Sequence, residues 1–272
     1  MKEFPDIRIS VVIPAYNRAH TITKTIQSAL SQTYPVSEII VVDDASSDNT
    51  EQVVKAIDDD RIRYCCLEKN KGASGARNHG VAQARYETIA FLDSDDTWRP
   101  EKMEKQIAYL ESHKQCRFVY CAFVRHYSSW DQIIPDMESG RKLEGDILSD
   151  LLIDNTVSTQ TIVIQKDLFE EVGGFDESLR RLQDWDLAIK CSKLGFIGFV
   201  PEVLVDAPLL DDALTSNMDA YFESRCKMMQ KYRQEYLATD TFNIAAASIL
   251  ELAQKFNMLE SVQEMLLQYI SS

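Results

Sequence analysis

The first hundred residues alternate between short apolar runs and segments whose apolar positions have helical spacing. Four runs rich in β-branched residues are predicted as strands: residues 9–14, 38–43, 61–67 and 88–93. Three segments between them are predicted as helices: residues 18–33, 48–57 and 74–84, the second begun by a capping Asp48. Strands that alternate with helices form right-handed βαβ units. The pattern therefore predicts an α/β fold with a mostly parallel sheet flanked by helices.

The pattern becomes mixed after residue 100. Six further elements are predicted: a helix over 101–113, a strand over 117–123, an irregular loop over 124–145, a strand over 159–165, a short helix begun by Asp167 and a helix over 184–194. Beyond residue 211 the chain is predicted as largely helical, with amphipathic stretches at 242–252 and 259–270. We therefore expect one domain over residues 1–210, with halves at 8–100 and 101–210, and a helical C-terminal extension over residues 211–272.

Composition and charge exclude several classes of protein. With 45% hydrophobic and 26% charged residues among 272, the chain has the composition of an ordinary globular protein. Its formal net charge of −14, without a block of Lys or Arg, argues against nucleic acid as a partner and against a membrane contact made by a basic stretch. The N-terminus has no apolar leader, and no run approaches the roughly 18 apolar residues of a membrane span. We expect a cytoplasmic protein without a transmembrane segment, with the inner face of the membrane as the alternative location.

The six cysteines lack both the CxxC pairs and the neighbouring His spacing of a zinc finger. We expect reduced, mostly buried thiols. A disulfide framework or a zinc site is the alternative.

Acidic residues follow two of the predicted strands, and ligands of parallel α/β sheets bind beyond the carboxyl ends of the strands. Asp93, Asp95 and Asp96 follow the strand at 88–93. Their hard oxygens suit Mg²⁺ or Mn²⁺, which takes one or two carboxylates and completes its shell with water and phosphate. Asp43 and Asp44, at the end of the second strand, can accept hydrogen bonds from a base or a ribose. The alternatives are a solvated turn for the first group and a helix cap for the second.

Residues 70–78 (NKGASGARN) join the third strand to a helix. A glycine-rich turn before a helix presents backbone N–H groups and a positive dipole end to an anion, and Arg77 adds a charged fork. The segment is neither a GxGxxG fingerprint nor a GxxxxGK[ST] loop, which argues against a dinucleotide fold and an ordinary NTPase. The alternative is a plain glycine turn with a surface arginine.

Residues 183–187 (QDWDL) place Asp184 and Asp186 two positions apart at the start of a helix. Such positions do not share a helix face, so one carboxylate is expected to cap the helix while the other projects into the cleft. Trp185 between them offers an aromatic face. On the residues alone, a helix cap made by both carboxylates, with the tryptophan in the core, is the favoured interpretation.

Four segments, in their order and spacing, resemble glycosyltransferase family 2: SVVIPAYNRAHTITKTIQSALSQTYPVSEIIVVDDASSDNT, NKGASGARNHGVAQARYETIAFLDSDD, GGFDESL and QDWDL. The resemblance covers residues 8–205 and fades beyond residue 215. It implies a GT-A fold and an inverting, metal-assisted enzyme that moves a sugar from a nucleoside diphosphate donor, usually UDP-linked, to an acceptor hydroxyl. It also implies that residues 8–100 form the nucleotide-binding half and residues 101–210 the acceptor half.

The resemblance implies roles for single residues. A nucleotide site is expected at Pro14, Ala15, Tyr16, Asn17, Asp43, Asp44, Arg77, Asp93 and Ser94. Asp95 is expected to bind Mn²⁺ or Mg²⁺, Asp184 to act as the catalytic base, and Trp185 and Gly174 to contact the acceptor or the sugar. The chain departs from the family pattern in two places. Gln183 replaces the Glu before the base, and residues 207–212 lack the His of the metal site, for which Asp211 is the alternative ligand.

The resemblance further implies a UDP-sugar donor and a saccharide or lipid-linked saccharide acceptor, in bacterial surface polysaccharide or lipopolysaccharide synthesis. Two alternatives remain open. One is a catalytically weak nucleotide-sugar-binding partner in a polysaccharide assembly, motivated by Gln183 and the missing His. The other is a nucleotidyltransferase, which would need a glycine-rich basic loop where this chain has PAYNR. The helices at 242–270 are expected to pack on the domain, with a homodimer contact or a peripheral membrane contact as alternatives.

Overall fold

The computed structural model describes residues 7–208 and 218–271. The strands form one mixed sheet in the order β3-β2-β1-β4-β8-β6-β9-β5, with β7 paired to β6. Their bounds are β1 (Ile9–Ala15), β2 (Glu38–Asp43), β3 (Ile62–Cys66), β4 (Thr88–Phe91), β5 (Thr97–Trp98), β6 (Phe118–His126), β7 (Asp131–Ile134), β8 (Val163–Gln165) and β9 (Ile197–Pro208). Strands β3, β2, β1 and β4 are parallel, as predicted. The other half is mixed, because β8 is antiparallel to both β4 and β6, while β9 is parallel to β6.

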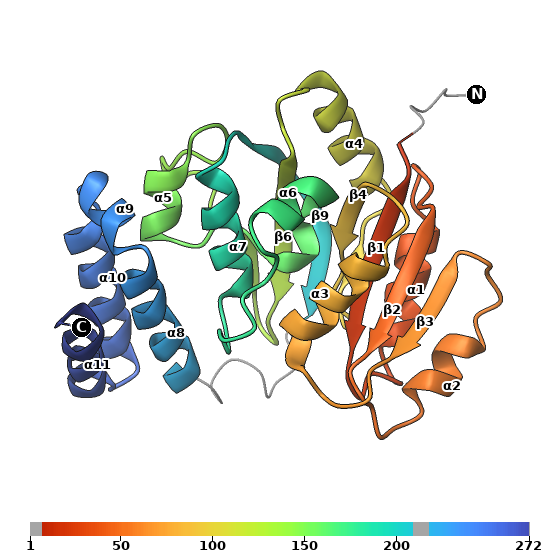
Figure 1. Ribbon diagram of the computed structural model, residues 1–272, viewed down its shortest axis with the longest axis horizontal. Coiled ribbons are helices and arrows are strands. Elements are labelled where there is room, and N and C mark those ends of the chain that lie inside the picture. Colours follow the sequence, from red (N-terminus) through yellow and green to blue (C-terminus); the bar gives the residue numbers. More distant parts are fainter. Residues whose placement is uncertain (1–6, 209–217, 272) are drawn as a thin grey trace.

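Helices cover both faces of the sheet (Figure 1). Their bounds are α1 (Ile22–Leu30), α2 (Thr50–Lys55), α3 (Gly72–Gln83), α4 (Lys102–Ser112), α5 (Leu148–Ile153), α6 (Lys166–Glu171) and α7 (Gln183–Ser192). Alternate side chains of a strand point to opposite faces. Val11 and Ile13 of β1 therefore pack in one core with α1, α2 and α4. Val12 packs in the other core with α3, α5, α6 and α7. This confirms the predicted α/β fold.

The C-terminal extension consists of α8 (Met218–Lys231), α9 (Arg233–Ala238), α10 (Phe242–Lys255) and α11 (Leu259–Ser271). It lies at the end of the molecule opposite β3 and α2 (Figure 1). Phe222, Met229 and Ile249 of the extension belong to the same buried cluster as Leu151 of α5 and Trp185 of α7. The hydrophobic core therefore continues from the sheet into the extension. Within the described residues, no helix is long and apolar enough to cross a membrane.

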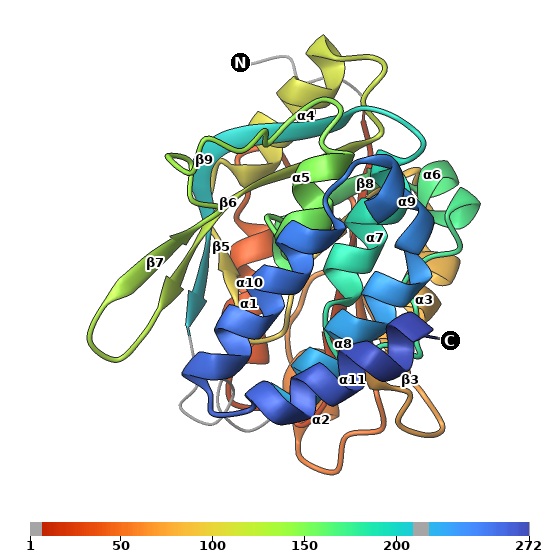
Figure 2. The same ribbon diagram turned by 90° about the vertical axis from the view of Figure 1, so that its left-hand side faces the viewer.

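Two predicted segments differ from the structure. The irregular loop predicted over 124–145 instead contains the end of β6 and the strand β7, which form an antiparallel pair that projects from the body of the molecule (Figure 2). The strand predicted over 159–165 begins as a 3₁₀ turn, Thr159–Thr161, and only then becomes β8. There the Thr161 hydroxyl donates a hydrogen bond to the Ser158 carbonyl, which stabilises the turn.

Helix starts also differ from the prediction. α6 begins at Lys166, so Asp167 lies inside its first turn rather than at the cap. α2 begins at Thr50, whose amide and hydroxyl both donate to Asp48 Oδ1, so the predicted carboxylate does stabilise this start from two positions upstream. Both cases show that a short polar side chain marks a helix start only to within one or two residues.

Helix α3 approaches the sheet closely at Gly80. A Cβ at this position would lie 2.4 Å from Val12 Cγ1 and 3.1 Å from Val42 Cγ2. Gly80→Ala should therefore lower the free energy of unfolding by about 1–3 kcal/mol, because both valines are fully buried and have no room to move. Chemical denaturation measures the change.

Gly195→Ala is the control for this substitution. Nothing lies within 4 Å of a Cβ there, and the expected change is within about 0.5 kcal/mol. Equal stability of Gly80→Ala and the wild type would show that α3 can move away from the sheet.

Candidate functional site

Two adjoining pockets lie beyond the carboxyl ends of β1, β2 and β4. The smaller, of about 270 Å³, is lined by Pro14, Ala15, Tyr16, Arg18, Asp44, Ala73, Ala76, Arg77, Asp93, Ser94 and Asp95. The larger, of about 650 Å³, extends from Asp93 towards α7 and the C-terminal extension. Ala73, Arg77 and Asp93 line both pockets. The structure thus brings together most of the residues predicted from the strand ends.

Arg77 and Asp93 form the boundary between the pockets. Arg77 Nη2 lies 2.5 Å from Asp93 Oδ1, and the arginine is only 6% exposed. Its guanidinium carbon lies 5.5 Å from the centroid of the Phe175 ring. Arg77 Nε is buried and has no hydrogen-bond partner among the described residues. The Arg77 side chain lines both pockets, so its guanidinium provides a cation that is suited to an anion bound in either one.

Asp44 fixes the glycine-rich turn in front of α3. Its Oδ1 accepts a hydrogen bond from the Lys71 amide at 2.7 Å, and its Oδ2 accepts one from the Gly72 amide at 2.8 Å. Gly72 has φ +76°, a left-handed conformation that favours glycine. The Asp44 carboxylate, which was predicted to contact the base of a nucleotide, therefore lies in the wall of the smaller pocket and also orients the turn.

Two residues predicted for the nucleotide site do not line either pocket. The Asp43 carboxylate accepts hydrogen bonds from the Tyr64 hydroxyl at 2.6 Å and from the Ser46 amide at 2.7 Å, and it is buried. Burial together with the Asp43 charge raises the pKa of the Tyr64 hydroxyl. Asn17, at φ +53°, accepts a hydrogen bond from the Ser47 amide. Both side chains thus shape the loops after β1 and β2.

The acidic group after β4 is partly desolvated. Burial raises the pKa of Asp95, and the neighbouring Asp93 charge raises it further, while Arg18 opposes the shift. Arg18 Nη2 lies 3.6 Å from Asp95 Oδ2, a contact that the sequence analysis missed although Arg18 follows the first strand directly. Burial also raises the pKa of Asp96 well above its ordinary value, with Asp93 and Asp95 as further causes.

Asp93 and Asp95 provide carboxylate oxygens at the mouth of the smaller pocket, which is the donor chemistry that Mg²⁺ and Mn²⁺ prefer. Within residues 7–208 and 218–271, no group of three or more His, Cys, Asp and Glu side chains could hold a metal on its own. The residues present fit a cation whose remaining ligands come from a bound phosphate and water. The alternative ligand Asp211 lies outside the described residues.

Asp184 lies in the wall of the larger pocket, on the first turn of α7. Its Oδ1 accepts hydrogen bonds from the Trp185 amide at 2.8 Å and from Asn155 Nδ2 at 3.5 Å. Burial raises the pKa of its carboxyl, the Asp93 charge adds to this, and Arg77 opposes it. Gln183, which replaces the expected Glu, donates a hydrogen bond to the Leu179 carbonyl. The Asp184 carboxylate is thus partly buried in the wall of the larger pocket and fixed by two hydrogen bonds.

The structure corrects the expectation for Trp185 and Gly174. Trp185 lies in the wall of the larger pocket but is only 1% exposed, and the Arg225 guanidinium carbon lies 3.8 Å from the centroid of its ring, which leaves a sugar little of the ring to stack on. Gly174 lines neither pocket. A Cβ there would lie 2.8 Å from Asn78 Oδ1 and 3.0 Å from the Phe169 ring, so this position requires glycine for packing. Trp185 is a core residue, as the residues alone favoured, and the contact with the acceptor or the sugar that accompanied the family resemblance is not supported.

The larger pocket contains residues that the sequence analysis did not single out. Its basic side chains are Arg77, Arg125, Arg180 and Arg181. Its apolar side chains from the C-terminal extension are Met218, Leu252 and Phe256, next to Tyr221. No local sequence signal marks them, since α8 and α10 reach the pocket only through the tertiary fold.

The family model for glycosyl transferase family 2 matches residues 10–173. Over 213 residues the chain is 30% identical to the putative teichuronic acid biosynthesis glycosyltransferase TuaG of Bacillus subtilis. This match covers 77% of this chain and 82% of that protein. Over 128 residues it is 43% identical to WfaP of Escherichia coli, a UDP-Glc:α-D-GlcNAc-diphosphoundecaprenol β-1,3-glucosyltransferase; this match covers 46% of this chain and 49% of that protein.

Two solved structures share the fold. Staphylococcus aureus TarS 1–349 in complex with UDP-GlcNAc superposes with a TM-score of 0.68 at 22% identity, over 82% of this chain and 66% of that chain. The mannosyltransferase PcManGT of Pyrobaculum calidifontis, in complex with GDP-Man and Mn²⁺, superposes with a TM-score of 0.65 at 17% identity, over 100% of this chain and 79% of that chain. These similarities assign a GT-A-like fold.

Proposed function

Since the chain belongs to glycosyl transferase family 2 and is therefore a glycosyltransferase, we propose that it moves a sugar from a UDP-sugar to an acceptor hydroxyl with inversion, in the synthesis of a bacterial surface polysaccharide. One observation carries this proposal. A pocket at the strand ends and a second pocket beside Asp184 meet at Arg77 and Asp93. A donor and an acceptor bound in them would meet where the pockets join.

The smaller pocket is suited to the nucleoside diphosphate. The glycine-rich turn held by Asp44 precedes the N-terminus of α3, which favours negative charge. Arg18 and Arg77 add cationic donors in the same pocket. The UDP-linked donors named for WfaP and for the TarS complex support UDP as the nucleotide here.

Asp95, with Asp93 beside it, would hold the divalent cation, as the carboxylate chemistry of the pocket mouth and the Mn²⁺ of the PcManGT complex support. When bound, this ion neutralises charge on the diphosphate leaving group. Arg77 does the same from the protein side, because its guanidinium lines the pocket and carries a positive charge.

Asp184 would act as the base. The acceptor oxygen attacks the anomeric carbon, a bond forms between them, and the bond from that carbon to the phosphate oxygen breaks, so that UDP leaves with the electron pair. The acceptor proton passes to the Asp184 carboxylate. A single displacement from the opposite face inverts the anomeric centre. The raised pKa of Asp184 brings this base closer to the pH at which the enzyme would work.

The acceptor would be a lipid-linked saccharide diphosphate. The larger pocket combines the basic side chains Arg125, Arg180 and Arg181 with an apolar wall from α8 and α10. Arginine guanidinium groups bind phosphates, and an apolar wall binds the first units of a lipid chain. The diphosphoundecaprenol acceptor named for WfaP supports the same class.

Asp184→Asn should abolish sugar transfer while leaving UDP binding intact, because the amide cannot accept the proton but keeps the shape of the side chain. Product analysis with UDP-sugars and a diphosphate-linked acceptor measures transfer, and calorimetry measures UDP binding. Asp154→Asn, a loss of charge in the same pocket, is the control and should retain activity. Retained transfer by Asp184→Asn would reject this base, and UDP binding without turnover by the wild type would favour the non-catalytic alternative.

Removal of divalent ions should weaken UDP binding at least about tenfold, equal to about 1.4 kcal/mol, because Asp93 and Asp95 then repel the diphosphate. Calorimetry in the presence of a chelator, followed by addition of Mn²⁺ or Mg²⁺, measures the effect. In Asp95→Asn, binding should no longer respond to the metal. Equal UDP affinity of the wild type with and without metal would contradict the proposed cation site.

Arg180→Gln and Arg125→Gln should each raise the KM for a diphosphate-linked acceptor about tenfold, the loss of about 1.4 kcal/mol of binding, and leave the donor KM unchanged. Steady-state kinetics with phosphorylated and unphosphorylated forms of the acceptor measure this. Arg117→Gln, which removes a surface pair with Glu171, is the control. An equal effect on both forms of the acceptor would exclude recognition of the diphosphate.

A further inference from the structure

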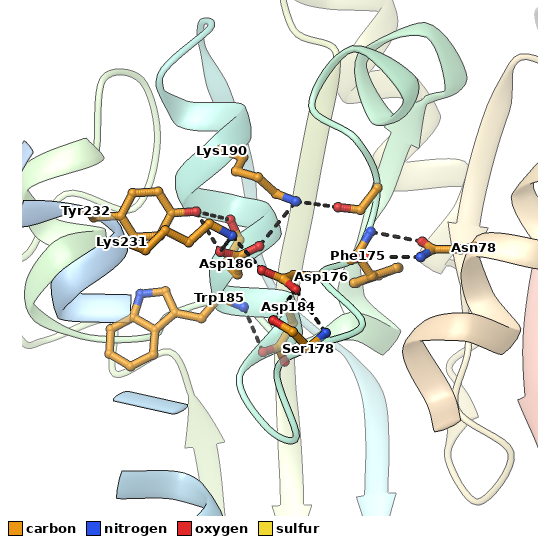
Figure 3. A network of polar contacts seen from close by, with 11 residues as sticks. Asn78, Phe175, Asp176, Ser178, Asp184, Trp185, Asp186, Lys190, Lys231 and Tyr232 are labelled. Atoms are coloured by element: carbon orange, nitrogen blue, oxygen red, sulfur yellow. Dashed lines mark hydrogen bonds and ion pairs between the residues drawn. The ribbon is translucent and has the colours of Figure 1, made fainter. Parts of the chain in front are cut away.

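Three consecutive residues at the start of α7 face different surroundings. Asp184 and the edge of the buried Trp185 line the larger pocket, while Asp186 is buried against the C-terminal extension (Figure 3). Asp186 is fully buried, although carboxylates are almost never buried without partners. Asp186 has no role in the proposed reaction, so the burial of its carboxylate needs another explanation.

The Asp186 carboxylate accepts hydrogen bonds mainly from residues of the C-terminal extension. Its Oδ1 accepts hydrogen bonds from Lys231 Nζ at 2.6 Å and from the Tyr232 hydroxyl at 2.6 Å. Lys190 Nζ, from α7 itself, lies 3.2 Å from Oδ2. These contacts, drawn in Figure 3, tie the first turn of α7 to the end of α8.

Trp185 contacts two helices, α5 and α8. Arg225 of α8 lies over its indole ring, and Arg225 Nη2 donates a hydrogen bond to the Ile153 carbonyl at the end of α5. Trp185 Nε1 donates to the Leu151 carbonyl, also in α5. Trp185 is thus enclosed between α5 and α8, and it cannot rotate without breaking these contacts.

The first turn of α7 is stabilised locally by the hydrogen bond from the Trp185 amide to Asp184 Oδ1, but its N-cap adds nothing to this. Its N-cap residue, Leu182, is a non-glycine residue at φ +66°, and its side chain makes no capping hydrogen bond. A left-handed residue of this kind persists only where its surroundings hold it. The preceding Arg181 amide donates to the Ser224 hydroxyl of α8 at 3.3 Å, so α8 also contacts the chain just before the helix.

The same contacts extend towards α3. Lys231 Nζ lies 2.8 Å from Asp176 Oδ2, and Lys190 Nζ donates to the Gly174 carbonyl. The backbone of the adjoining Phe175 exchanges two hydrogen bonds with the Asn78 side chain, next to Arg77 (Figure 3). The network therefore joins the elements that carry Arg77 and Asp184.

We propose that Lys231 and Tyr232 are positioning residues for catalysis. By bonding Asp186, they fix the rotation of the first turn of α7 and so the direction of the Asp184 carboxylate. This proposal rests on the proposed role of Asp184 as the base. It assigns a function to the C-terminal extension: it holds the base in place from outside the sheet domain. A displacement of about 1 Å at such a group can lower a rate about a hundredfold.

Tyr232→Phe removes one hydrogen bond to Asp186 and keeps the ring. It should lower kcat about ten- to hundredfold and leave the donor KM and UDP binding unchanged, because the smaller pocket lies beyond Arg77. Tyr120→Phe is the matched control. Its hydroxyl, on the buried strand β6, donates to the Leu143 carbonyl at 2.8 Å and does not contact Asp186, so its loss should lower stability and not kcat.

Lys231→Met and Lys231→Arg form a second test. Met should lower kcat in the same way as Tyr232→Phe, and Arg should restore part of the rate because it keeps a cation beside Asp186. Thermal unfolding of each variant, monitored by circular dichroism, shows whether it folds.

A fall in kcat of similar size in Tyr232→Phe and Tyr120→Phe would overturn the proposal, since it would follow the loss of stability alone. Full kcat in both Tyr232→Phe and Lys231→Met would also overturn it. Failure of the base assignment is visible separately, as transfer retained by Asp184→Asn in an otherwise wild-type chain.

Discussion

The ion pair between Arg77 and Asp93 is the contact on which the rest of the site depends. Arg77 is provided by α3, which Gly80 allows to approach β1 and β2 closely, and Asp93 by the end of β4. Because both residues line both pockets, their pairing fixes where the two pockets join, and under the proposed function it would set the distance between donor and acceptor. The parallel half of the sheet thus determines where the two substrates of a family 2 glycosyltransferase would meet.

The charge of the chain and the charge of its pockets have opposite signs. The net charge is −14, yet Arg18 and Arg77 line the smaller pocket and Arg125, Arg180 and Arg181 line the larger one. An acidic surface repels polyanions at long range, whereas a local group of cations accepts a small diphosphate. Net charge therefore argues against nucleic acid as a partner without arguing against a phosphorylated sugar donor.

The sequence predicts the elements whose apolar pattern is continuous along the chain, and it misses contacts between distant residues. Residues 9–14 and 38–43 are β-branched runs buried on both faces, and they form β1 and β2 nearly as predicted. β7 was missed because its exposed residues show no alternation, and β9 because Pro201 and Glu202 interrupt its apolar pattern where its register with β6 shifts. The local pattern favoured a buried Trp185, but its partner Arg225 lies forty positions away, and no local pattern could show that contact.

A single helix, α8, faces both the larger pocket and the buried Asp186. Met218 and Tyr221 lie in the pocket wall, while Arg225 and Lys231 contact Trp185 and Asp186. Acceptor choice and turnover rate would therefore not evolve independently in this chain. The C-terminal extension could be exchanged with that of a relative in order to change the acceptor. The exchange would also replace the residues that hold the first turn of α7, which carries Asp184.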